Sequence, residues 1–419
     1  MIQTEKLIYV YENWLTNEPS LIGILHSAFV RGTENFSFEY TPEWLHSGNS
    51  AFSLDPDLSL FNGRQYTPLN KELFGLFADS CPDRWGRLLM TRKEAIRARK
   101  EDRKPRRLTE SDYLLGVYDK ARMGALRFSI EKGGEFLSNE KASSTPPWVS
   151  LRDLENASVS FESEDNELDE QWLDKLLAPG SSLGGARPKA TVQAPDGTLW
   201  IAKFPSIHDE YNCGAWEKVV HDLAMLCSLN VPESKLMFFS KNGGTFLVRR
   251  FDRNGKRRIH FASAMTLLGK TDGASAADGT GYLDLAEFIR ANGAEPKYDL
   301  LELWKRIVFN MAVSNTDDHL RNHGFLLTPA GWRLSPLYDV NPVPSSDCLS
   351  LNITESDNSI DLSLALEVSK YFGLSKAEAA KISSEIVATV QKNWVGIAKK
   401  NKLTQGSIEF MRPAFSLHC

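Results

Sequence analysis

The hydrophobic positions of the first 150 residues change from a strand pattern to a helix pattern. Short β-prone runs, each broken by turn residues, occupy residues 7–11, 21–25 and 36–40. From Pro68 onward the apolar residues recur at helical spacing instead, and they are Leu73, Phe74, Phe77, Trp85, Leu88 and Leu89. We therefore predict an N-terminal subdomain over residues 1–150, in which strands precede helices.

Residues 179–400 form a second predicted domain, which begins with a loop of small residues and a β-hairpin. The loop, residues 179–189, is rich in glycine and serine. Beyond it, Pro195-Asp196-Gly197 is a turn sequence between β-prone runs at 190–194 and 199–204. The pattern then predicts a helix over 215–229 and strands over 236–239 and 245–251.

The rest of this domain is predicted to be mostly helical. One apolar stripe leads into Asn315, and its members are Leu300, Trp304, Ile307, Val308 and Met311. A capping box of Ser375 and Glu378 marks the start of a final helix. Residues 151–178 are an acidic boundary region with a polar helix over 168–177, and residues 401–419 are predicted as a C-terminal tail. The fold class predicted from these elements is α+β.

The composition narrows the class of protein. With 419 residues, 42% of them hydrophobic and 25% charged, the chain is typical of a globular protein of about two or three domains. The formal net charge of −5 argues against a protein that coats nucleic acid by bulk electrostatics. Five scattered cysteines show no CxxC spacing, so neither a disulfide framework nor a zinc site is predicted. No apolar run approaches the roughly 20 residues that span a bilayer, and we expect a cytoplasmic protein with no membrane partner.

One segment is strongly basic. Residues 84–107 hold eleven Lys and Arg against three acidic residues. Such a run is either the solvated face of a helix or a docking surface for an acidic partner or for DNA phosphates. Both interpretations stay open at this point.

The most informative motif follows the apolar stripe directly. It reads Asn315-Thr316-Asp317-Asp318-His319-Leu320-Arg321-Asn322, and Asp339 supplies a further carboxylate after a predicted hairpin (325–327 and 332–334). Phosphoryl transfer to a hydroxyl uses this set of groups, because one Asp orients and deprotonates the acceptor while an Asn and another Asp hold magnesium. An Asp and an Asn at this spacing are also common in ordinary loops, so the order of the other parts matters.

Upstream residues supply those parts in the order that a kinase-like site needs. The Gly/Ser loop exposes backbone N–H groups to a polyanion. Lys203 is either an edge-strand lysine or a phosphate ligand, and Glu217 on the next predicted helix could pair with it. The strand that ends at Arg249 to Phe251 stands where a hinge between two lobes would bind adenine. We therefore predict a two-lobed, protein-kinase-like catalytic domain after the N-terminal mixed β/α subdomain.

His319 and Arg321 lie inside the motif and each has two interpretations. His319 is either a structural hydrogen-bonding residue, which the proximity of Asp317 favours, or an acid or base. Arg321 either offsets charge on the transferring phosphoryl group or is an exposed loop arginine. His323 is interpreted as structural.

Taken together, these motifs resemble the HipA family of bacterial serine/threonine kinases, the toxin half of type II toxin–antitoxin pairs. In the N-terminal part the resemblance rests on residues 40–45 (YTPEWL) and 79–87 (DSCPDRWGR). The stronger matches lie at residues 182–189 (SLGGARPK), 203–205 (KFP), 250–253 (RFDR), 315–322 (NTDxHxxN) and 336–340 (PLYDV). The resemblance spans nearly the full chain.

The resemblance implies a kinase that depends on ATP and Mg²⁺. By position, Asp317 is the catalytic base, with His319 and Arg321 beside it, and Asn322 and Asp339 are the metal ligands. The implied nucleotide-binding residues are Ser182, Gly184, Gly185, Lys189, Lys203, Glu217, Arg249 and Phe251. Ser182 matches the serine that such kinases autophosphorylate, and the neighbouring Ser181 is the alternative. Arg321 stands where the family often has lysine, and Arg249 stands where a close relative has an acidic residue.

The resemblance also implies partners. These are a HipB-like helix-turn-helix antitoxin, operator DNA reached through the antitoxin complex, and a protein substrate, since the best-known substrates of the family are aminoacyl-tRNA synthetases.

Two alternative functions stay open. A catalytically weak scaffold that binds an antitoxin and DNA as a co-repressor is supported by the basic segment but not by the intact set of site residues. A small-molecule phosphotransferase would use the same site with a different acceptor.

Overall fold

The chain divides into two compact units. The computed structural model describes residues 5–15, 18–47, 52–138, 145–163, 173, 176, 185 and 187–417. Unit 1 comprises Met1–Ser206 and Asp252–Ala262, and unit 2 comprises Ile207–Phe251 and Ser263–Cys419. Of the polar helix predicted over 168–177, only Leu173 and Leu176 are described, and both are helical and buried. The domain boundaries predicted at residues 150, 178 and 400 stay a prediction.

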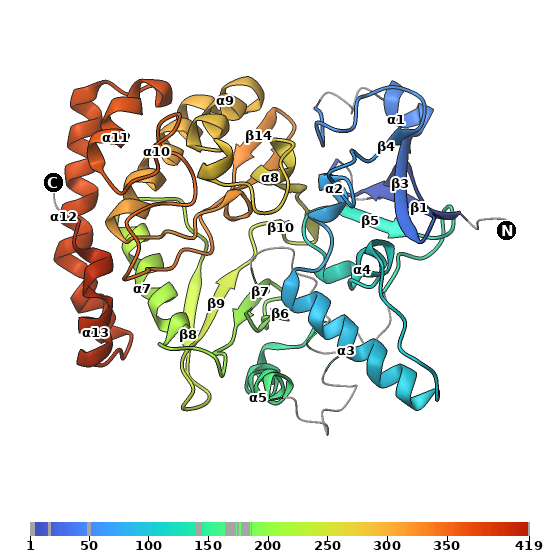
Figure 1. The fold of residues 1–419 in the computed structure, drawn as a ribbon, viewed down its shortest axis with the longest axis horizontal. Coiled ribbons are helices and arrows are strands. Elements are labelled where there is room, and N and C mark those ends of the chain that lie inside the picture. The colour runs from blue at the N-terminus through green and yellow to red at the C-terminus, as the bar shows by residue number, and fades with distance from the viewer. Residues whose placement is uncertain are drawn as a thin grey trace. The chain divides into compact units, whose positions relative to one another are not determined.

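An antiparallel five-stranded sheet organises the first part of unit 1 (Figure 1). In the spatial order β4-β3-β2-β1-β5, its strands are β1 (Lys6–Glu12), β2 (Ser20–Val30), β3 (Thr33–Tyr40), β4 (Gln65–Tyr66) and β5 (Leu126–Ser129). The strands predicted at 7–11, 21–25 and 36–40 are thereby confirmed. Arg31 and Gly32 join β2 to β3 with φ of 53° and 86°. Positive φ at both loop residues is the mark of the type I′ turn, whose twist matches that of paired strands.

Unit 1 also contains helices. They are α1 (Pro42–His46), α2 (Gly75–Ala78), α3 (Arg84–Lys100), α4 (Glu110–Leu115), α5 (Leu151–Glu162) and the 3₁₀ turns η1 (Asp119–Ala121) and η3 (Trp148–Ser150). Helix α2 contacts the sheet through three aromatic rings, because Phe77 lies 5.3 Å from Phe38 of β3 and 6.2 Å from Phe128 of β5 between ring centroids. The helical pattern predicted after Pro68 is confirmed, although Leu88 on α3 is 49% exposed and contributes little to the core.

Two small hairpins complete unit 1. The first pairs β6 (Lys189–Gln193) with β7 (Leu199–Lys203). Its turn is closed by Ala194 N, which donates to Thr198 O at 2.8 Å, and Gly197 takes a φ of 83° there. This confirms the predicted hairpin around Pro195-Asp196-Gly197. The second pairs β10 (Arg253–Asn254) with β11 (Arg257–Arg258).

Unit 2 is mostly helical, as predicted (Figure 1). Its strands are β8 (Ser234–Met237), which pairs with β9 (Thr245–Arg249), and β13 (Gly324–Thr328), which pairs with β14 (Gly331–Leu334); β12 (Phe261–Ser263) ends at its border. Its α-helices are α7 (Cys213–Leu226), α8 (Ala264–Leu267), α9 (Tyr282–Asn292), α10 (Pro296–Ala312), α11 (Leu362–Val368), α12 (Lys376–Lys400) and α13 (Gln405–Met411). Its 3₁₀ turns are η4 (Ala276–Asp278), η5 (Leu320–Asn322), η6 (Ser369–Phe372) and η7 (Arg412–Phe415).

The long helix α12 lies against both α7 and α10 (Figure 1). The predicted capping box at its start is present, since Ser375 and Glu378 satisfy each other's backbone N–H groups. The segment after residue 400 also packs here, because Phe415 stacks on Trp394 with ring centroids 4.6 Å apart. None of the described helices combines the length and apolarity that crossing a bilayer requires.

A buried ion pair on α10 positions the chain that leads to Asp339. Glu302 and Arg306 are both buried, and Arg306 Nε and Nη2 each donate to Glu302 Oε1 at 3.0 Å. Arg306 Nη2 also donates to Ser335 O at 2.7 Å, and the Asn230 N–H donates to Glu302 Oε1 at 3.0 Å. The ion pair thus satisfies backbone groups of Ser335 and Asn230, which lie in two remote segments. Because Ser335 directly follows β14, this contact holds the start of the segment that leads to Asp339.

Two helical glycines of unit 2 should respond oppositely to alanine. A Cβ on Gly214 of α7 would lie 2.1 Å from Gly244 O, so we expect Gly214→Ala to cost about 1–3 kcal/mol of unfolding free energy. Gly396 of α12 is exposed and has open space at its Cβ, so Gly396→Ala should stabilise by about 0.5–1 kcal/mol. Urea unfolding of both variants beside the wild type checks this. Two shifts of the same sign would contradict the close approach of α7 to Gly244.

Candidate functional site

The loop after α10 presents one carboxylate outward and the next one inward. Ser314 takes a φ of 46°, which turns the chain sharply at the end of the helix. Asp317 is exposed, whereas Asp318 is only 1% exposed. The chain then enters η5, where Asn322 Nδ2 donates to Asp317 O at 2.8 Å. The predicted base and a predicted metal ligand are therefore joined across one turn of chain.

The other end of the Asn322 amide is the least expected feature of this loop. Asn322 Oδ1 is buried, with the residue 2% exposed, and no hydrogen-bond donor among the described residues reaches it. A buried acceptor without a partner is rare in folded proteins, and an ion or water bound there is the usual explanation. An amide oxygen is also a ligand that hard cations such as Mg²⁺ accept. The orphaned oxygen thus fits the metal role that the sequence assigns to Asn322.

Asp339 lies close enough to Asp317 for their charges to interact. Burial raises the pKa of Asp317; the nearby His319 lowers it, while the carboxylates of Asp339 and Asp318 raise it further. Asp339 itself has a φ of 57°, a left-handed conformation that concentrates at functional sites. Two repelling carboxylates beside an unpartnered amide oxygen are a set of oxygens that a divalent cation would satisfy.

The described residues contain no group of three or more His, Cys, Asp and Glu side chains arranged for a metal. Magnesium seldom needs such a cage, because it keeps several waters and binds through one or two carboxylates and substrate phosphates. Asn322 and Asp339 therefore fit Mg²⁺ brought with a nucleotide better than a permanently bound structural metal.

The segment around Asp339 is tied to the loop on both sides. Before it, the Tyr338 hydroxyl donates to Arg321 O at 2.7 Å. After it, Asn341 N donates to Asn315 Oδ1 at 3.2 Å and Val343 N donates to Ser314 O at 3.0 Å. The ring of Phe251, which was predicted to lie near adenine, packs 5.6 Å from the ring of Tyr338. Phe251 is thus linked to the loop through one ring contact with Tyr338 and the hydrogen bond from the Tyr338 hydroxyl to Arg321 O.

Sequence reasoning missed the role of Asp318. Its Oδ2 accepts hydrogen bonds from Tyr282 OH at 2.6 Å, Asn310 Nδ2 at 2.7 Å and His323 Nε2 at 2.8 Å. Burial opposes ionisation of Asp318, but the charge and hydrogen bond of His323, with the Tyr282 hydroxyl, hold its pKa below the ordinary value. Burial and the Asp318 charge hold the pKa of Tyr282 well above its usual range. The sequence motif gave a role to Asp317 and none to Asp318, because only the fold shows that the Asp318 carboxylate points inward.

The contacts of His319 are compatible with both of its predicted roles, structural hydrogen bonding and acid or base chemistry. Its backbone N–H donates to Asp317 O at 3.1 Å, and its ring Nδ1 is buried with no hydrogen-bond partner among the described residues. His323, by contrast, is fully buried against Asp318, which agrees with a structural role.

The predicted nucleotide-binding residues are distributed over both units. In unit 1, Lys189 lies opposite Lys203 in the β6–β7 register, so both side chains project from one face of the hairpin. Lys189 Nζ is buried and contacts Asp83 Oδ2 at 2.8 Å and Gly185 O at 3.1 Å. Asp83 in turn caps α3 through a 2.9 Å bond from Gly86 N. Lys189 therefore anchors the end of the Gly/Ser loop to a carboxylate of the N-terminal subdomain.

The other predicted nucleotide residues lie in unit 2 or outside the residues that the structure describes. Glu217 is buried on α7, and its predicted pairing with Lys203 of unit 1 stays a prediction. Arg249 is the last residue of β9 and its side chain is half exposed. Its Nη1 lies 3.8 Å from Glu233 Oε2. The remaining predicted residues, Ser181, Ser182 and Gly184, lie outside the described residues.

Part of the basic segment 84–107 is neutralised inside unit 1. Arg87 binds Glu110 through two hydrogen bonds of 2.5 and 2.7 Å. Arg103 pairs with Glu94 at 2.6 Å, and Arg106 pairs with Asp112 at 2.8 Å. These pairs favour a structural interpretation for the three arginines.

Comparison with known proteins places the chain in a family. The model of the HipA-like C-terminal domain matches residues 181–394, about half of the chain and nearly all of the predicted site. The chain belongs to the HipA family. The model of the HipA N-terminal domain matches residues 16–129 as well. The resemblance predicted from the motifs is thereby confirmed.

One solved structure extends the match to the whole fold. HipA of Shewanella oneidensis, solved with HipB and its operator DNA, superposes with a TM-score of 0.64 over 97% of this chain and 95% of its own, at 17% identity. This similarity confirms the α+β, kinase-like HipA fold with its N-terminal β/α subdomain. The Helicobacter pylori proinflammatory kinase CtkA matches 51% of this chain and 94% of its own, at 15% identity with a TM-score of 0.34.

One sequence relative carries a kinase name. Protein Y4mE of Sinorhizobium fredii, named as a kinase, is 31% identical over 183 residues. The aligned region spans 38% of this HipA-family chain and 41% of the length of Y4mE.

Proposed function

We propose that this HipA-family protein is a serine/threonine protein kinase that uses ATP and Mg²⁺. The orphaned Asn322 Oδ1 carries the proposal, because a buried acceptor without a partner usually binds an ion or a water, and an amide oxygen is a ligand that Mg²⁺ accepts. The charge of Asp339, which raises the pKa of Asp317, supports it, because two carboxylates that disfavour each other's ionised form suit a shared cation. Family membership and the kinase name of Y4mE support the same reaction class.

Each residue of the loop has a role that follows from its surroundings. The Asp317 side chain reaches solvent and would accept the proton of the acceptor hydroxyl. The protein that covers the other part of its carboxyl raises its pKa by desolvation, which moves its basicity toward working pH. Asn322 and Asp339 would hold magnesium, which supplies positive charge to the phosphates when bound. Arg321 would add a positive charge near the transferring phosphoryl group. We assign Lys203, paired with Glu217, to the phosphates, and the residues from Arg249 to Phe251 to adenine.

We extend the proposal to regulation and partners. Ser182, or Ser181 beside it, is the proposed autophosphorylation site in the Gly/Ser loop. The HipA structure with HipB and operator DNA supports a HipB-like antitoxin and operator DNA as partners of this chain. An aminoacyl-tRNA synthetase is the proposed class of substrate, and a kinase of this kind would act in the cytoplasm. A co-repressor scaffold would instead bind antitoxin and operator without transferring phosphate.

Intact mass after incubation with ATP and magnesium tests the kinase. We expect the wild-type chain to gain the mass of one phosphoryl group, and the gain to map to Ser181 or Ser182. Asp339→Asn is the matched control, because asparagine tolerates the left-handed φ of 57° while it removes the charge; it should gain nothing. The mass before incubation must be read too, so that earlier phosphorylation is recognised. A wild type that starts unmodified, binds ATP and gains no mass would contradict the proposal and favour the scaffold or a small-molecule enzyme.

A further inference from the structure

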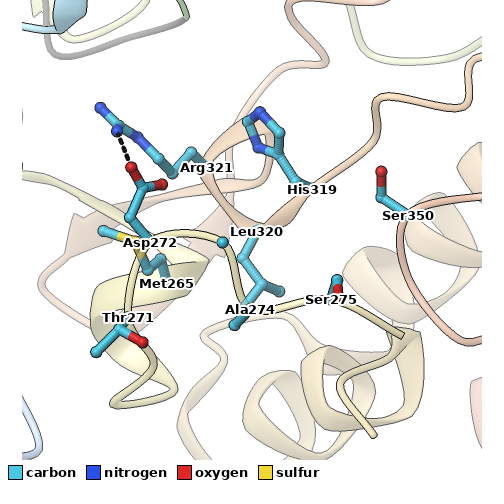
Figure 2. Close-up of a pocket in the computed structure, with 10 residues that line it drawn as sticks. Met265, Thr271, Asp272, Ala274, Ser275, His319, Leu320, Arg321 and Ser350 are labelled. Carbon is cyan, nitrogen blue, oxygen red and sulfur yellow. Dashed lines mark hydrogen bonds and ion pairs between the residues drawn. The ribbon is translucent and has the colours of Figure 1, made fainter. Parts of the chain in front are cut away.

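A cavity of about 380 Å³ opens directly beside the catalytic loop of unit 2. One wall is His319, Leu320 and Arg321, and the facing wall is the segment 271–275 (Figure 2). Met265 and Ser350 complete the lining. Of the proposed metal ligands and nucleotide residues that the structure describes, none lines the cavity, so these residues would hold ATP and Mg²⁺ outside it.

Both walls are held by hydrogen bonds, so the cavity is formed in advance. The segment 271–275 begins with a turn that Ala274 N closes on Thr271 O at 3.2 Å, and Gly273 takes the φ of 90° that the third position of a type II turn requires. Ala276 N, just beyond, donates to Ser350 O at 2.8 Å. Ser350 Oγ donates in turn to Thr316 O at 2.7 Å, next to the proposed base. The facing wall is therefore tied to the catalytic loop.

The lining suits a single side chain with a polar end. The volume of the cavity lies at the lower end of the roughly 300–1,000 Å³ typical of ligand pockets, so the cavity is small for a nucleotide. The side chains of Met265, Leu320 and Ala274 are apolar, and Thr271, Ser275 and Ser350 add hydroxyl groups. A polypeptide side chain with an aliphatic stem would match this mixture.

The charge at the rim comes from one ion pair. Arg321 Nη1 lies 3.2 Å from Asp272 Oδ2, and Figure 2 shows the two side chains reaching toward each other at one end of the cavity. Asp272 is 72% exposed, whereas Arg321 is 30% exposed. An exposed pair of this kind contributes little stability, so a competing cation can replace Arg321 at small cost.

We propose that this cavity binds the side chain next to the phosphorylated serine or threonine of a protein substrate, and that Asp272 selects a lysine or arginine there. The inference rests on the proposed kinase function. Arg321 precedes Asn322, so the negative charge of the phosphoryl group draws its guanidinium away from Asp272 when ATP is bound. The exposed Asp272 carboxylate then pairs with the substrate cation, while the stem of that side chain covers Met265 and Leu320.

A peptide array tests the selection. The peptides carry a central serine, and each flanking position is changed in turn to Lys, Ala or Glu; the full-length enzyme and magnesium-ATP are added. In the wild type we expect Lys to exceed Glu at one flanking position by about fivefold, the size of effect that one partly exposed ion pair produces. Asp272→Asn should bring the Lys/Glu ratio close to one, and Asp272→Lys should invert it. Ratios within one variant cancel any loss of active enzyme.

Glu287→Gln is the matched control, because Glu287 is exposed on α9 and does not line the cavity. It should keep the wild-type ratio. A wild type that prefers Glu, or a Lys/Glu ratio that Asp272→Asn and Asp272→Lys leave unchanged, overturns the assignment to Asp272. So does an enzyme that gains its own phosphoryl mass but phosphorylates no peptide. If neither the chain nor any peptide is phosphorylated, the proposed kinase function falls, and the inference falls with it.

Discussion

Replacing Asp317 by asparagine is expected to slow phosphate transfer about a thousandfold, which is typical of losing a positioned general base. Asparagine keeps the shape of the side chain but cannot accept the proton of the acceptor hydroxyl. The loop itself should survive, because Asn322 Nδ2 bonds the main-chain oxygen of residue 317 and not its carboxylate. Initial rates at saturating ATP and magnesium measure the loss, and nucleotide binding should stay within about twofold if only the chemical step is affected.

The control for this variant is Asp347→Asn, which makes the same chemical change on an exposed carboxylate outside the loop. It should retain the wild-type rate. If Asp317→Asn kept more than about a tenth of the wild-type rate, a base contribution of the usual size would be excluded. His319 would then be the residue to test next as acid or base, because its ring Nδ1 is buried without a hydrogen-bond partner among the described residues.

Replacing the neighbouring Asp318 by alanine is expected to cost about 3–5 kcal/mol of unfolding free energy, the usual result of removing one partner from a buried charged network. The variant leaves Tyr282 OH, Asn310 Nδ2 and His323 Nε2 without their common acceptor. Urea unfolding measures the loss. Asp317→Asn is the internal comparison, since that carboxylate is exposed and its removal should change stability by less than about 0.5 kcal/mol.

The lowered pKa of Asp318 also predicts how the free energy of unfolding depends on pH. Its pKa is lowered in the folded state, so its contribution is complete above the unfolded carboxyl pKa of about 4 and is lost as pH falls through the folded pKa. The difference in unfolding free energy between the wild type and Asp318→Ala should therefore shrink below about pH 4. A difference that stayed constant down to pH 3 would mean that the Asp318 carboxylate is not ionised in the native network.

Adjacent aspartates with opposite roles show where prediction from sequence stops. The motif from Asn315 to Asn322, together with the Gly/Ser loop, Lys203 and Glu217 before it, predicted the reaction class, because phosphoryl transfer needs those residue types in that order. The resemblance assigned the base to Asp317 and predicted no role for Asp318. The turn at Ser314 and the buried partners from α9 and α10, which are up to 36 residues away in the chain, turn the Asp318 carboxylate inward.

Lys189 is a second case of the same kind. The resemblance implies that Lys189 is a nucleotide ligand, which stays a prediction, and the structure shows its side chain buried against Asp83, which lies 106 residues earlier. Asp83 caps α3 through Oδ1 and contacts Lys189 through Oδ2. Only the tertiary structure shows that one carboxylate does both.

Local features were determined by the sequence alone. The β6–β7 hairpin, the capping box of α12 and the apolar stripe of α10 depend on residues within a few positions of one another, so their patterns predict them directly. The tertiary structure decided which polar groups are buried: the orphaned oxygen of Asn322, the inward Asp318 and the cavity between Arg321 and Asp272. These depend on contacts between remote segments, and the free energy of burying a polar group is set by every neighbour that the fold brings to it.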